Sequence, residues 1–261
     1  MKAFRLNRLF AAASRRCLAI AVGHGLDDPD RCVRTLAAAA PDVLQLSIGQ
    51  AALLQFIPGK NKPALILRAD VTNVHGPALP PAPFSRMIGN AVEQAVRLDA
   101  AGVVVSLLHI PGEPALTAQC VENIARLKPD CERFALPLII EPLVIRASAQ
   151  ADGDWKKILP LIRHACELGA DLIQTEPPDE VADFHHVVES AGRIPMLVRA
   201  DSAAPDAKIC DRAEKLIQQG VAGLVYGRDF IQHANPSVLT RALMSIVHDG
   251  ATAADAVRFI G

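Results

Sequence analysis

Short runs of Val, Ile, Leu and Ala alternate with longer amphipathic segments along nearly the whole chain. Each run spans four to seven residues and is bounded by polar residues, proline or glycine. Such runs are typical of buried parallel strands. The pattern predicts eight strands, at Cys17–Val22, Val43–Leu46, Ala64–Ala69, Gly102–Leu108, Leu138–Glu141, Asp171–Thr175, Met196–Ala200 and Gly223–Tyr226.

The amphipathic segments between these runs predict helices. In the segment 206–219, for example, Ile209, Ala213 and Leu216 fall on one helical face. The predicted helices are Asp30–Ala38, Phe84–Asp99, Thr117–Arg126, Trp155–Leu168, Glu180–Ser190, Ala207–Gln219 and Pro236–His248. Repeated β-α units without a linker predict an α/β fold, a single (β/α)8 TIM barrel formed by one domain over residues 1–261. We expect the proline-rich loop Gly76–Pro83 over the barrel mouth, as a lid or a stiff connector.

The composition of the 261 residues agrees with this fold and narrows the partners. Hydrophobic residues make up 51% but aromatic residues only 4%, which suits buried parallel strands. A net charge of −1 gives no sign of nucleic acid or an acidic membrane as a partner, and no apolar run approaches the roughly 20 residues that span a bilayer. The six cysteines form no Cys-x-x-Cys pair, so we expect reduced thiols in a cytoplasmic protein without a signal peptide.

Candidate functional residues follow from the predicted fold, because the active site of a (β/α)8 barrel lies at the carboxyl ends of its strands. Polar side chains there are costly beside an apolar core unless they have a use. A structural role, such as capping a helix, stays open for each of them. The residues at these strand ends are His24, Gln45, Ser47, Arg68, Asp70, Ser106, His109, Glu141, Gln174, Thr175, Glu176, Arg199, Asp201, Ser202, Tyr226, Gly227 and Arg228.

The eighth predicted strand ends at Gly227-Arg228 and passes directly into a short helix. Backbone N–H groups at a helix start and a guanidinium group both bind anions. The pattern indicates a phosphate site, while an ordinary strand-to-helix turn with a surface arginine is the alternative.

Together these motifs resemble the class I aldolase superfamily. It includes the archaeal-type fructose-bisphosphate, tagatose-bisphosphate and deoxyribose-phosphate aldolases and the aldolase-like autoinducer thiolases. The resemblance covers nearly the whole chain, and it implies a phosphorylated carbonyl substrate and a homo-oligomer. The segments that carry it are Leu18–Gly25, Ala91–Val103, Pro137–Leu143, Gly169–Thr175 and Gly227–Pro236.

Three departures from the family pattern fall at positions that carry chemistry. The family lysine that forms a Schiff base stands in the frame Gly-Ala-Asp-x-x-Lys-Thr, where this chain has Gln174. The aspartate before His-Gly is replaced by Gly23, and the glycine pair after the seventh strand by Asp201-Ser202. An amide cannot form an imine. Lys208 is the only lysine expected in a loop after a strand end, and its position suits contact with a phosphate better than with a carbonyl. We therefore expect no ordinary Schiff-base chemistry.

The resemblance implies an aldolase-like lyase for a small phosphorylated or anionic carbonyl compound. Glu141 and His24 would form the acid/base pair, with the pKa of Glu141 raised by the apolar barrel. Gln174 would donate a hydrogen bond to a carbonyl or hydroxyl group. The residues expected to contact substrate or phosphate are Gly227, Arg228, Ser202, Asp201, Arg68, Asp70, His109 and Glu176.

Two alternatives stay open. A catalytically silent paralogue would keep sugar-phosphate binding for regulation or assembly; the missing lysine and aspartate favour it, and the polar mouth counts against it. A metal-assisted lyase or isomerase would hold a divalent ion between histidines and carboxylates. No His-x-His or His-x-x-x-His spacing supports that ion, so we assign no cofactor and expect only a small-molecule substrate and further copies of the chain as partners.

Overall fold

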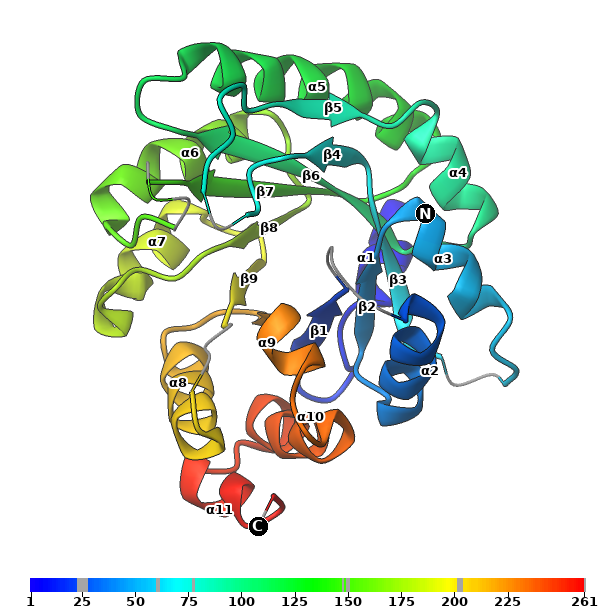
Figure 1. Ribbon diagram of the computed structural model, residues 1–261, viewed down its shortest axis with the longest axis vertical. Helices are drawn as coiled ribbons and strands as arrows, with labels where there is room; N and C mark the ends of the chain where they lie inside the picture. Colours follow the sequence, from blue (N-terminus) through cyan, green and yellow to red (C-terminus); the bar gives the residue numbers. More distant parts are fainter. Residues whose placement is uncertain are drawn as a thin grey trace.

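A computed structural model describes residues 1–22, 28–59, 62–76, 78–146, 148, 151–200 and 204–260, with only the backbone of Arg228 and Asp229. Eight parallel strands close into a barrel in the order β1-β10-β9-β8-β7-β6-β3-β2, and the helices surround it (Figure 1). The strands are β1 (Cys17–Ala21), β2 (Val43–Leu46), β3 (Ala64–Arg68), β6 (Gly102–His109), β7 (Leu138–Val144), β8 (Leu172–Thr175), β9 (Met196–Arg199) and β10 (Gly223–Tyr226). The predicted TIM barrel and its eight strands are confirmed.

Helices follow most of the strands. They are α1 (Lys2–Asn7), α2 (Pro29–Ala39), α3 (Ile48–Gln55), α4 (Ala91–Arg97), α5 (Pro114–Arg133), α6 (Trp155–Glu167), η1 (Val181–Asp183), α7 (Phe184–Ser190), α8 (Asp206–Gln218), α9 (Arg228–Ile231), α10 (Pro236–Met244), η2 (Ser245–Asp249) and α11 (Ala253–Val257). The sequence pattern missed α1, α3 and α11. Helix α3 has little separation of apolar and polar faces, and a capping box of Ser47 and Gln50 marks its start.

The prediction was wrong for the segment between β3 and α4. The first part of the predicted helix Phe84–Asp99 is instead a strand, β5 (Ser85–Met87), paired antiparallel with β4 (Asp70–Thr72). Asn90 then adopts a left-handed φ of 54°, which ends any helical run before α4. Residues 76–83 belong to the connection between β4 and β5. The hairpin lies between β6, which β4 contacts, and α5, which β5 contacts.

The barrel interior is layered. Leu9, which follows α1, is fully buried and packs in one apolar cluster with inward residues of the strands. Those residues include Val43, Ile66, Val104, Ile139, Leu172 and Leu197. Alternate residues of a strand face the same side, so the residue two positions further along each strand also faces inward. These next residues are all polar: Gln45, Arg68, Ser106, Glu141, Gln174 and Arg199. A polar ring therefore lies toward the carboxyl end of the barrel.

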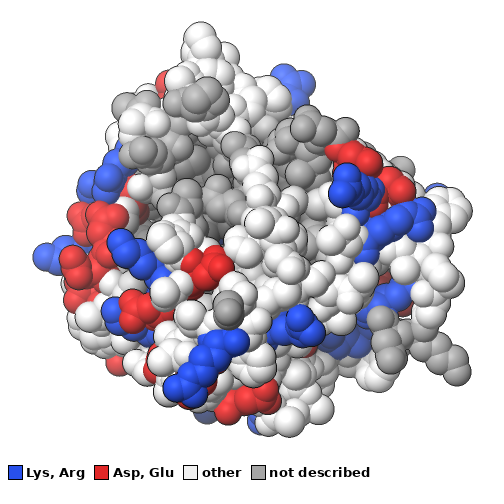
Figure 2. Space-filling model, turned by 60° about the horizontal axis from the view of Figure 1, so that its bottom comes forward, with Lys and Arg blue, Asp and Glu red and all other residues white. Residues whose placement is uncertain are grey.

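Acidic and basic side chains lie interspersed on the face in Figure 2. None of the helices in the described ranges is long and apolar enough to cross a membrane. All six cysteines are free thiols, and four of them are buried.

Candidate active site at the barrel mouth

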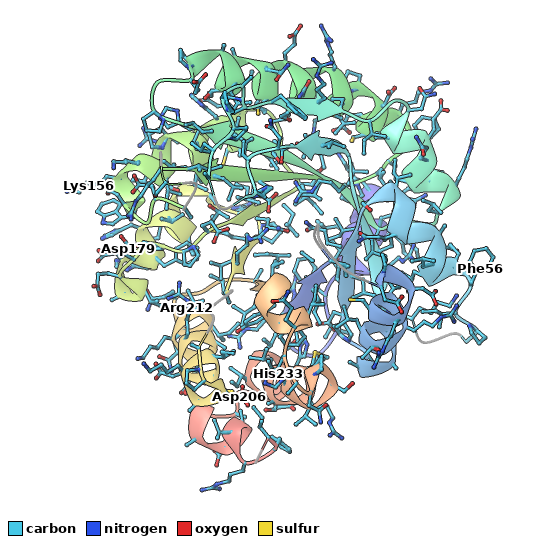
Figure 3. The ribbon with its side chains drawn as sticks, in the orientation of Figure 1. Phe56, Lys156, Asp179, Asp206, Arg212 and His233 are labelled. Carbon is cyan, nitrogen blue, oxygen red and sulfur yellow. The ribbon has the colours of Figure 1, made fainter. Side chains whose placement is uncertain are left out.

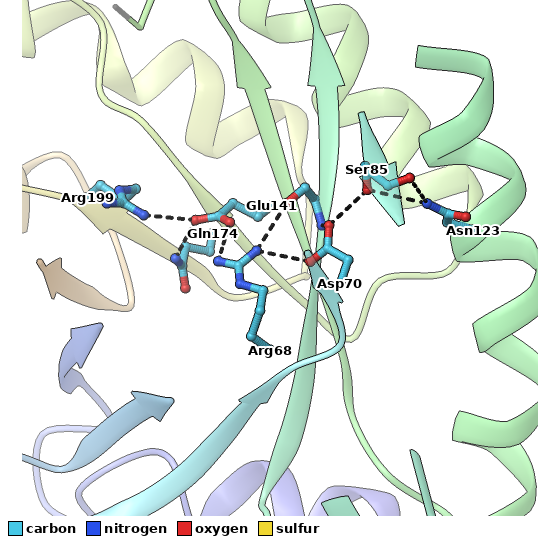
Figure 4. A network of polar contacts seen from close by, with 8 residues as sticks. Arg68, Asp70, Ser85, Asn123, Glu141, Gln174 and Arg199 are labelled. Carbon is cyan, nitrogen blue, oxygen red and sulfur yellow. Dashed lines mark hydrogen bonds and ion pairs between the residues drawn. The ribbon is translucent and has the colours of Figure 1, made fainter. Parts of the chain in front are cut away.

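Glu141 on β7 is fully buried and lies between two arginines (Figure 4). Arg68 on β3 donates a hydrogen bond of 2.6 Å from Nη2 to Glu141 Oε2. Arg199 on β9 donates one of 3.1 Å from Nη1 to Glu141 Oε1. The two arginine side chains are 20% and 21% exposed, whereas the Glu141 side chain is fully buried. A ligand entering the mouth would meet the cations first.

The charge state of Glu141 follows from these contacts. Burial raises the pKa of its carboxyl group, but the charges of Arg68 and Arg199, the hydrogen bond from Arg68 and the nearby His75 outweigh burial. The pKa therefore falls from its ordinary 4.5 to about 2. The expectation of a raised pKa was wrong, because it considered the apolar barrel without the two arginines. At neutral pH Glu141 is therefore a carboxylate that balances the charges of the two arginines.

Gln174 on β8 lies beside this carboxylate and is also fully buried. Its Nε2 donates a hydrogen bond of 2.7 Å to Glu141 Oε1, so the expected donor already serves a protein group. Its Oε1, like that of Gln45 on β2, is buried without a hydrogen-bond partner among the described residues. A buried acceptor left unpaired is costly, and a donor from a ligand would relieve that cost.

Glu176 and Asp70, which the sequence analysis expected to contact the substrate, instead contact Arg199 and Arg68. Glu176, which follows β8, forms an ion pair with Arg199 Nε at 2.9 Å. Asp70 forms a longer contact of 3.4 Å with Arg68 Nη1, and it is only 2% exposed, so its carboxylate lies behind Arg68 rather than in the mouth. His109 is exposed at the end of β6.

The structure describes only some of the residues predicted to bind the phosphate. His24, Asp201 and Ser202 lie outside the described residues, and the side chain of Arg228 is not described, so their roles stay predictions. Gly227 is buried between β10 and α9, and its carbonyl oxygen accepts the hydrogen bond that closes α9.

The segment after α9 is joined to the start of α8. His233 Nε2 lies 2.9 Å from Asp206 Oδ1, and His233 Nδ1 accepts a hydrogen bond from the backbone N–H of Asn235 (Figure 3). This link holds together the two segments from which a phosphate would be bound. Lys208, expected in a loop, stands instead as an exposed residue in the first turn of α8.

No lysine stands in any of the eight barrel strands. Lys128, Lys156 and Lys215 lie on the outer helices α5, α6 and α8, as predicted, and Lys156 projects at the edge of the molecule (Figure 3). Within the described part of the chain, no group of three or more His, Cys, Asp or Glu side chains fits a metal ion. Glu141 and Glu176 are both engaged by guanidinium groups of arginines.

Two polar residues near the site were not predicted from the sequence. Ser85 donates a hydrogen bond to Asp70, and Asn123 donates one to Ser85. Gln45 and Ser106 were named at strand ends without an assigned role, and Arg199 without its contact to Glu141. A signal was available: each stands two residues after an apolar inward position of its strand. No such period marks Ser85 or Asn123.

The closed parallel barrel, with its ring of polar side chains toward the carboxyl end, is a (β/α)8 fold. Residues 6–233 match the DeoC/LacD family of aldolases. The chain therefore belongs to the DeoC/LacD aldolase family, and the predicted resemblance is confirmed.

Two curated relatives align with almost the whole chain. The chain is 26% identical over 258 residues to the 2-amino-3,7-dideoxy-D-threo-hept-6-ulosonate synthase of Halobacterium salinarum, covering 96% of this chain and 92% of that protein. It is 25% identical over 265 residues to the 3-hydroxy-5-phosphonooxypentane-2,4-dione thiolase of an Enterobacter species, covering 98% of this chain and 84% of that protein.

Solved structures agree on the fold. An archaeal fructose 1,6-bisphosphate aldolase superposes with a TM-score of 0.79 at 23% identity, covering 96% of this chain and 100% of that chain. A second archaeal structure, with its catalytic lysine covalently bound to the carbinolamine intermediate of the substrate, gives 0.78 at 22% identity and covers 95% and 100%.

Proposed function

We propose that this protein is a carbon–carbon lyase for a small phosphorylated carbonyl compound and works without a lysine imine. Family membership supports the reaction class. The names of two relatives, a phosphonooxypentane-dione thiolase and a fructose-bisphosphate aldolase, support a phosphorylated substrate. The observation that carries the proposal is the carboxylate of Glu141 held between Arg68 and Arg199, with Gln174 beside it.

Cleavage of a carbon–carbon bond next to a carbonyl needs a base and a place for the released electron pair. In the proposed reaction Glu141 takes the proton of the substrate hydroxyl, that carbon becomes a carbonyl, and the bond electrons move to the enolate oxygen. A guanidinium carries five N–H donors, and such donors stabilise an oxyanion in a site sheltered from water. Arg68 and Arg199 would supply them in place of an iminium, and Glu141 would return its proton to the enolate carbon.

Substrate binding would prepare Glu141 for this role. An anionic or carbonyl oxygen that recruits Arg68 and Arg199 draws positive charge away from the carboxylate, and the pKa of Glu141 rises. The unpartnered Oε1 of Gln174 would accept a hydrogen bond from a substrate hydroxyl. Gly227 and Arg228 would hold the phosphate at the start of α9.

One observation favours a second candidate, a silent paralogue that binds the phosphate compound without turning it over. A general base is most effective when its pKa lies near the working pH, and the pKa of Glu141 is about 2. If a bound ligand leaves both ion pairs of Glu141 intact, the pKa of Glu141 stays low and its carboxylate is a poor base.

Trapping and turnover, measured on the same ligands, separate these functions. The protein is incubated with dihydroxyacetone phosphate and a panel of sugar phosphates; binding is measured by calorimetry, turnover by NMR, and imine formation by borohydride trapping with intact mass. We expect binding and turnover without a covalent adduct, and loss of turnover in Glu141→Gln. An adduct overturns the imine-free mechanism, binding without turnover selects the silent paralogue, and absence of binding overturns the phosphate substrate.

A further inference from the structure

A buried chain of polar contacts runs from Arg68 outward to helix α5 (Figure 4). Arg68 Nη1 donates hydrogen bonds to Ser106 Oγ at 3.1 Å and Asp70 Oδ1 at 3.4 Å. Asp70 Oδ2 accepts from the backbone N–H of Ser106 and from Ser85 Oγ, both at 3.1 Å. Asn123 Nδ2 lies 3.2 Å from the carbonyl oxygen of Ser85 and 3.3 Å from Ser85 Oγ.

The hydrogen bonds in this series all point the same way, from Asn123 through Ser85 to Asp70. A hydroxyl group carries one hydrogen, so when Ser85 Oγ accepts from the amide of Asn123 its own hydrogen is directed at Asp70. Asp70 Oδ2 is then fully engaged, and Oδ1 faces Arg68. Hydrogen bonds in such a series strengthen one another inside a protein. Removing the outer donor would let the Ser85 hydroxyl rotate away from Asp70.

These polar contacts are buried and end at the guanidinium of Arg68. Asp70, Ser85, Ser106 and Asn123 are 2%, 0%, 0% and 8% exposed. A buried carboxylate is costly unless it is paired and hydrogen-bonded, and the cation that pairs with Asp70 is Arg68. The β4–β5 hairpin brings Asp70 and Ser85 together, because residue 72 pairs with residue 85 and residue 70 with residue 87.

We infer that Asp70, Ser85 and Asn123 are positioning residues that hold the guanidinium of Arg68 against Glu141. The hairpin and the middle of α5 then belong to the machinery of the active site, although none of the three side chains reaches the mouth. The consequence for catalysis rests on the proposed function, whereas the effect on Arg68 does not.

The first test reads the position of Arg68 directly. The side-chain Nε–H signals of arginines are recorded by ¹⁵N–¹H NMR, and the Arg68 signal is assigned with Arg68→Lys. Ser85→Ala removes the central hydroxyl. Asn123→Asp keeps the shape but replaces the donor by an acceptor, so the Ser85 hydroxyl turns toward the new carboxylate. We expect the Arg68 signal to shift or broaden in both variants, although neither residue touches Arg68.

Two controls separate positioning from general loss of structure. Glu122→Gln changes the exposed neighbour of Asn123 on α5. Asn73→Ala removes two hydrogen bonds inside the hairpin, to Phe84 N–H and the carbonyl oxygen of Ala82, without touching the chain. The Arg68 signal should stay in place in both controls. An unmoved signal in Asn123→Asp overturns the inference, and this isosteric variant carries the test if Ser85→Ala does not fold.

The second test asks what the displacement does to the reaction. With dihydroxyacetone phosphate or the substrate found among the sugar phosphates, we expect Asn123→Asp to lower kcat about tenfold or more with a smaller change in KM, because small misplacements of a catalytic group are costly. A displaced Arg68 signal with unchanged kcat upholds the positioning and overturns the catalytic role of Arg68. Lost turnover with an unmoved signal overturns the positioning.

Discussion

The amide nitrogen of Gln174 lies 2.7 Å from Glu141 Oε1, at the strand position where the family resemblance places a lysine. Arg68 and Arg199 already bring two positive charges to the same carboxylate. A lysine ammonium at position 174 would be a third cation around one anion. A neutral amide satisfies Glu141 without adding that charge, so the glutamine and the two arginines form one consistent arrangement.

Installing the missing lysine should therefore not restore imine chemistry by itself. In Gln174→Lys the new ammonium would pair with Glu141, which raises the pKa of the lysine and keeps it protonated. In the double variant Glu141→Gln/Gln174→Lys the buried amine would face two arginines without the charge of Glu141, and its pKa would fall. We expect borohydride-trapped adducts with dihydroxyacetone phosphate near pH 8 in the double variant only, measured by intact mass. Glu141→Gln alone is the control, and equal trapping in both lysine variants would contradict the argument.

The stability of the protein in acid should depend on Glu141. Its pKa is about 2 in the folded protein against an ordinary 4.5, so the stabilisation that it contributes is complete above pH 4.5 and is lost as the pH falls toward 2. At pH 7 we expect Glu141→Gln to lower the free energy of unfolding by about 2 kcal/mol; breaking a fully buried pair costs more, but the two arginine side chains are partly exposed. The difference between wild type and variant should shrink toward pH 3 in urea titrations.

Glu122→Gln is the matched control for this experiment. Glu122 is 61% exposed and pairs with Arg126 one helical turn away, so its removal should change the stability by less than about 0.5 kcal/mol. A Glu141→Gln variant as stable as this control, or one whose deficit grows in acid, would contradict the depressed pKa.

Leu9 should be essential for the amino end of the barrel. It is fully buried under β1 and packs with Cys17, Ile66 and other inward side chains. Leu9→Ala removes that packing and leaves a cavity, so we expect a loss of about 2–5 kcal/mol in the free energy of unfolding. Phe4→Ala is the control, because Phe4 in the same terminal segment is 75% exposed and should change stability by about 0.5 kcal/mol or less. If urea denaturation gave the same loss of free energy of unfolding for Leu9→Ala and Phe4→Ala, the packing of Leu9 in the core would be contradicted.

The strands could be predicted because each is a short, mostly apolar run whose residues are mostly buried on both faces. The hairpin could not, because β4 and β5 have three residues each and are held through Asp70 and Ser85 rather than by an apolar period. The charge of Glu141 was mispredicted for a related reason. Its pKa depends on Arg68 and Arg199, which stand on β3 and β9, and no local pattern reports that they meet at one carboxylate.

The link between His233 and Asp206 gives a prediction about the anion end. Because His233 Nδ1 accepts the N–H of Asn235, the ring proton lies on Nε2 and is donated to Asp206 at 2.9 Å. This bond fixes the segment after α9 to the first residue of α8. If Gly227 and Arg228 hold the phosphate, His233→Ala should loosen that site and weaken binding of dihydroxyacetone phosphate by about 1 kcal/mol, the usual net worth of one hydrogen bond.

Asp206→Asn separates the effect of the His233–Asp206 hydrogen bond from the effect of the negative charge of Asp206. The amide oxygen of asparagine still accepts the His233 proton, so the link survives while a negative charge beside the anion site is removed. Calorimetry should then give an affinity equal to or tighter than that of wild type, because one source of repulsion to the phosphate is gone. Weakening in both variants would mean that the carboxylate itself is needed. Unchanged binding in His233→Ala would show that the start of α9 holds its ligand without support from α8.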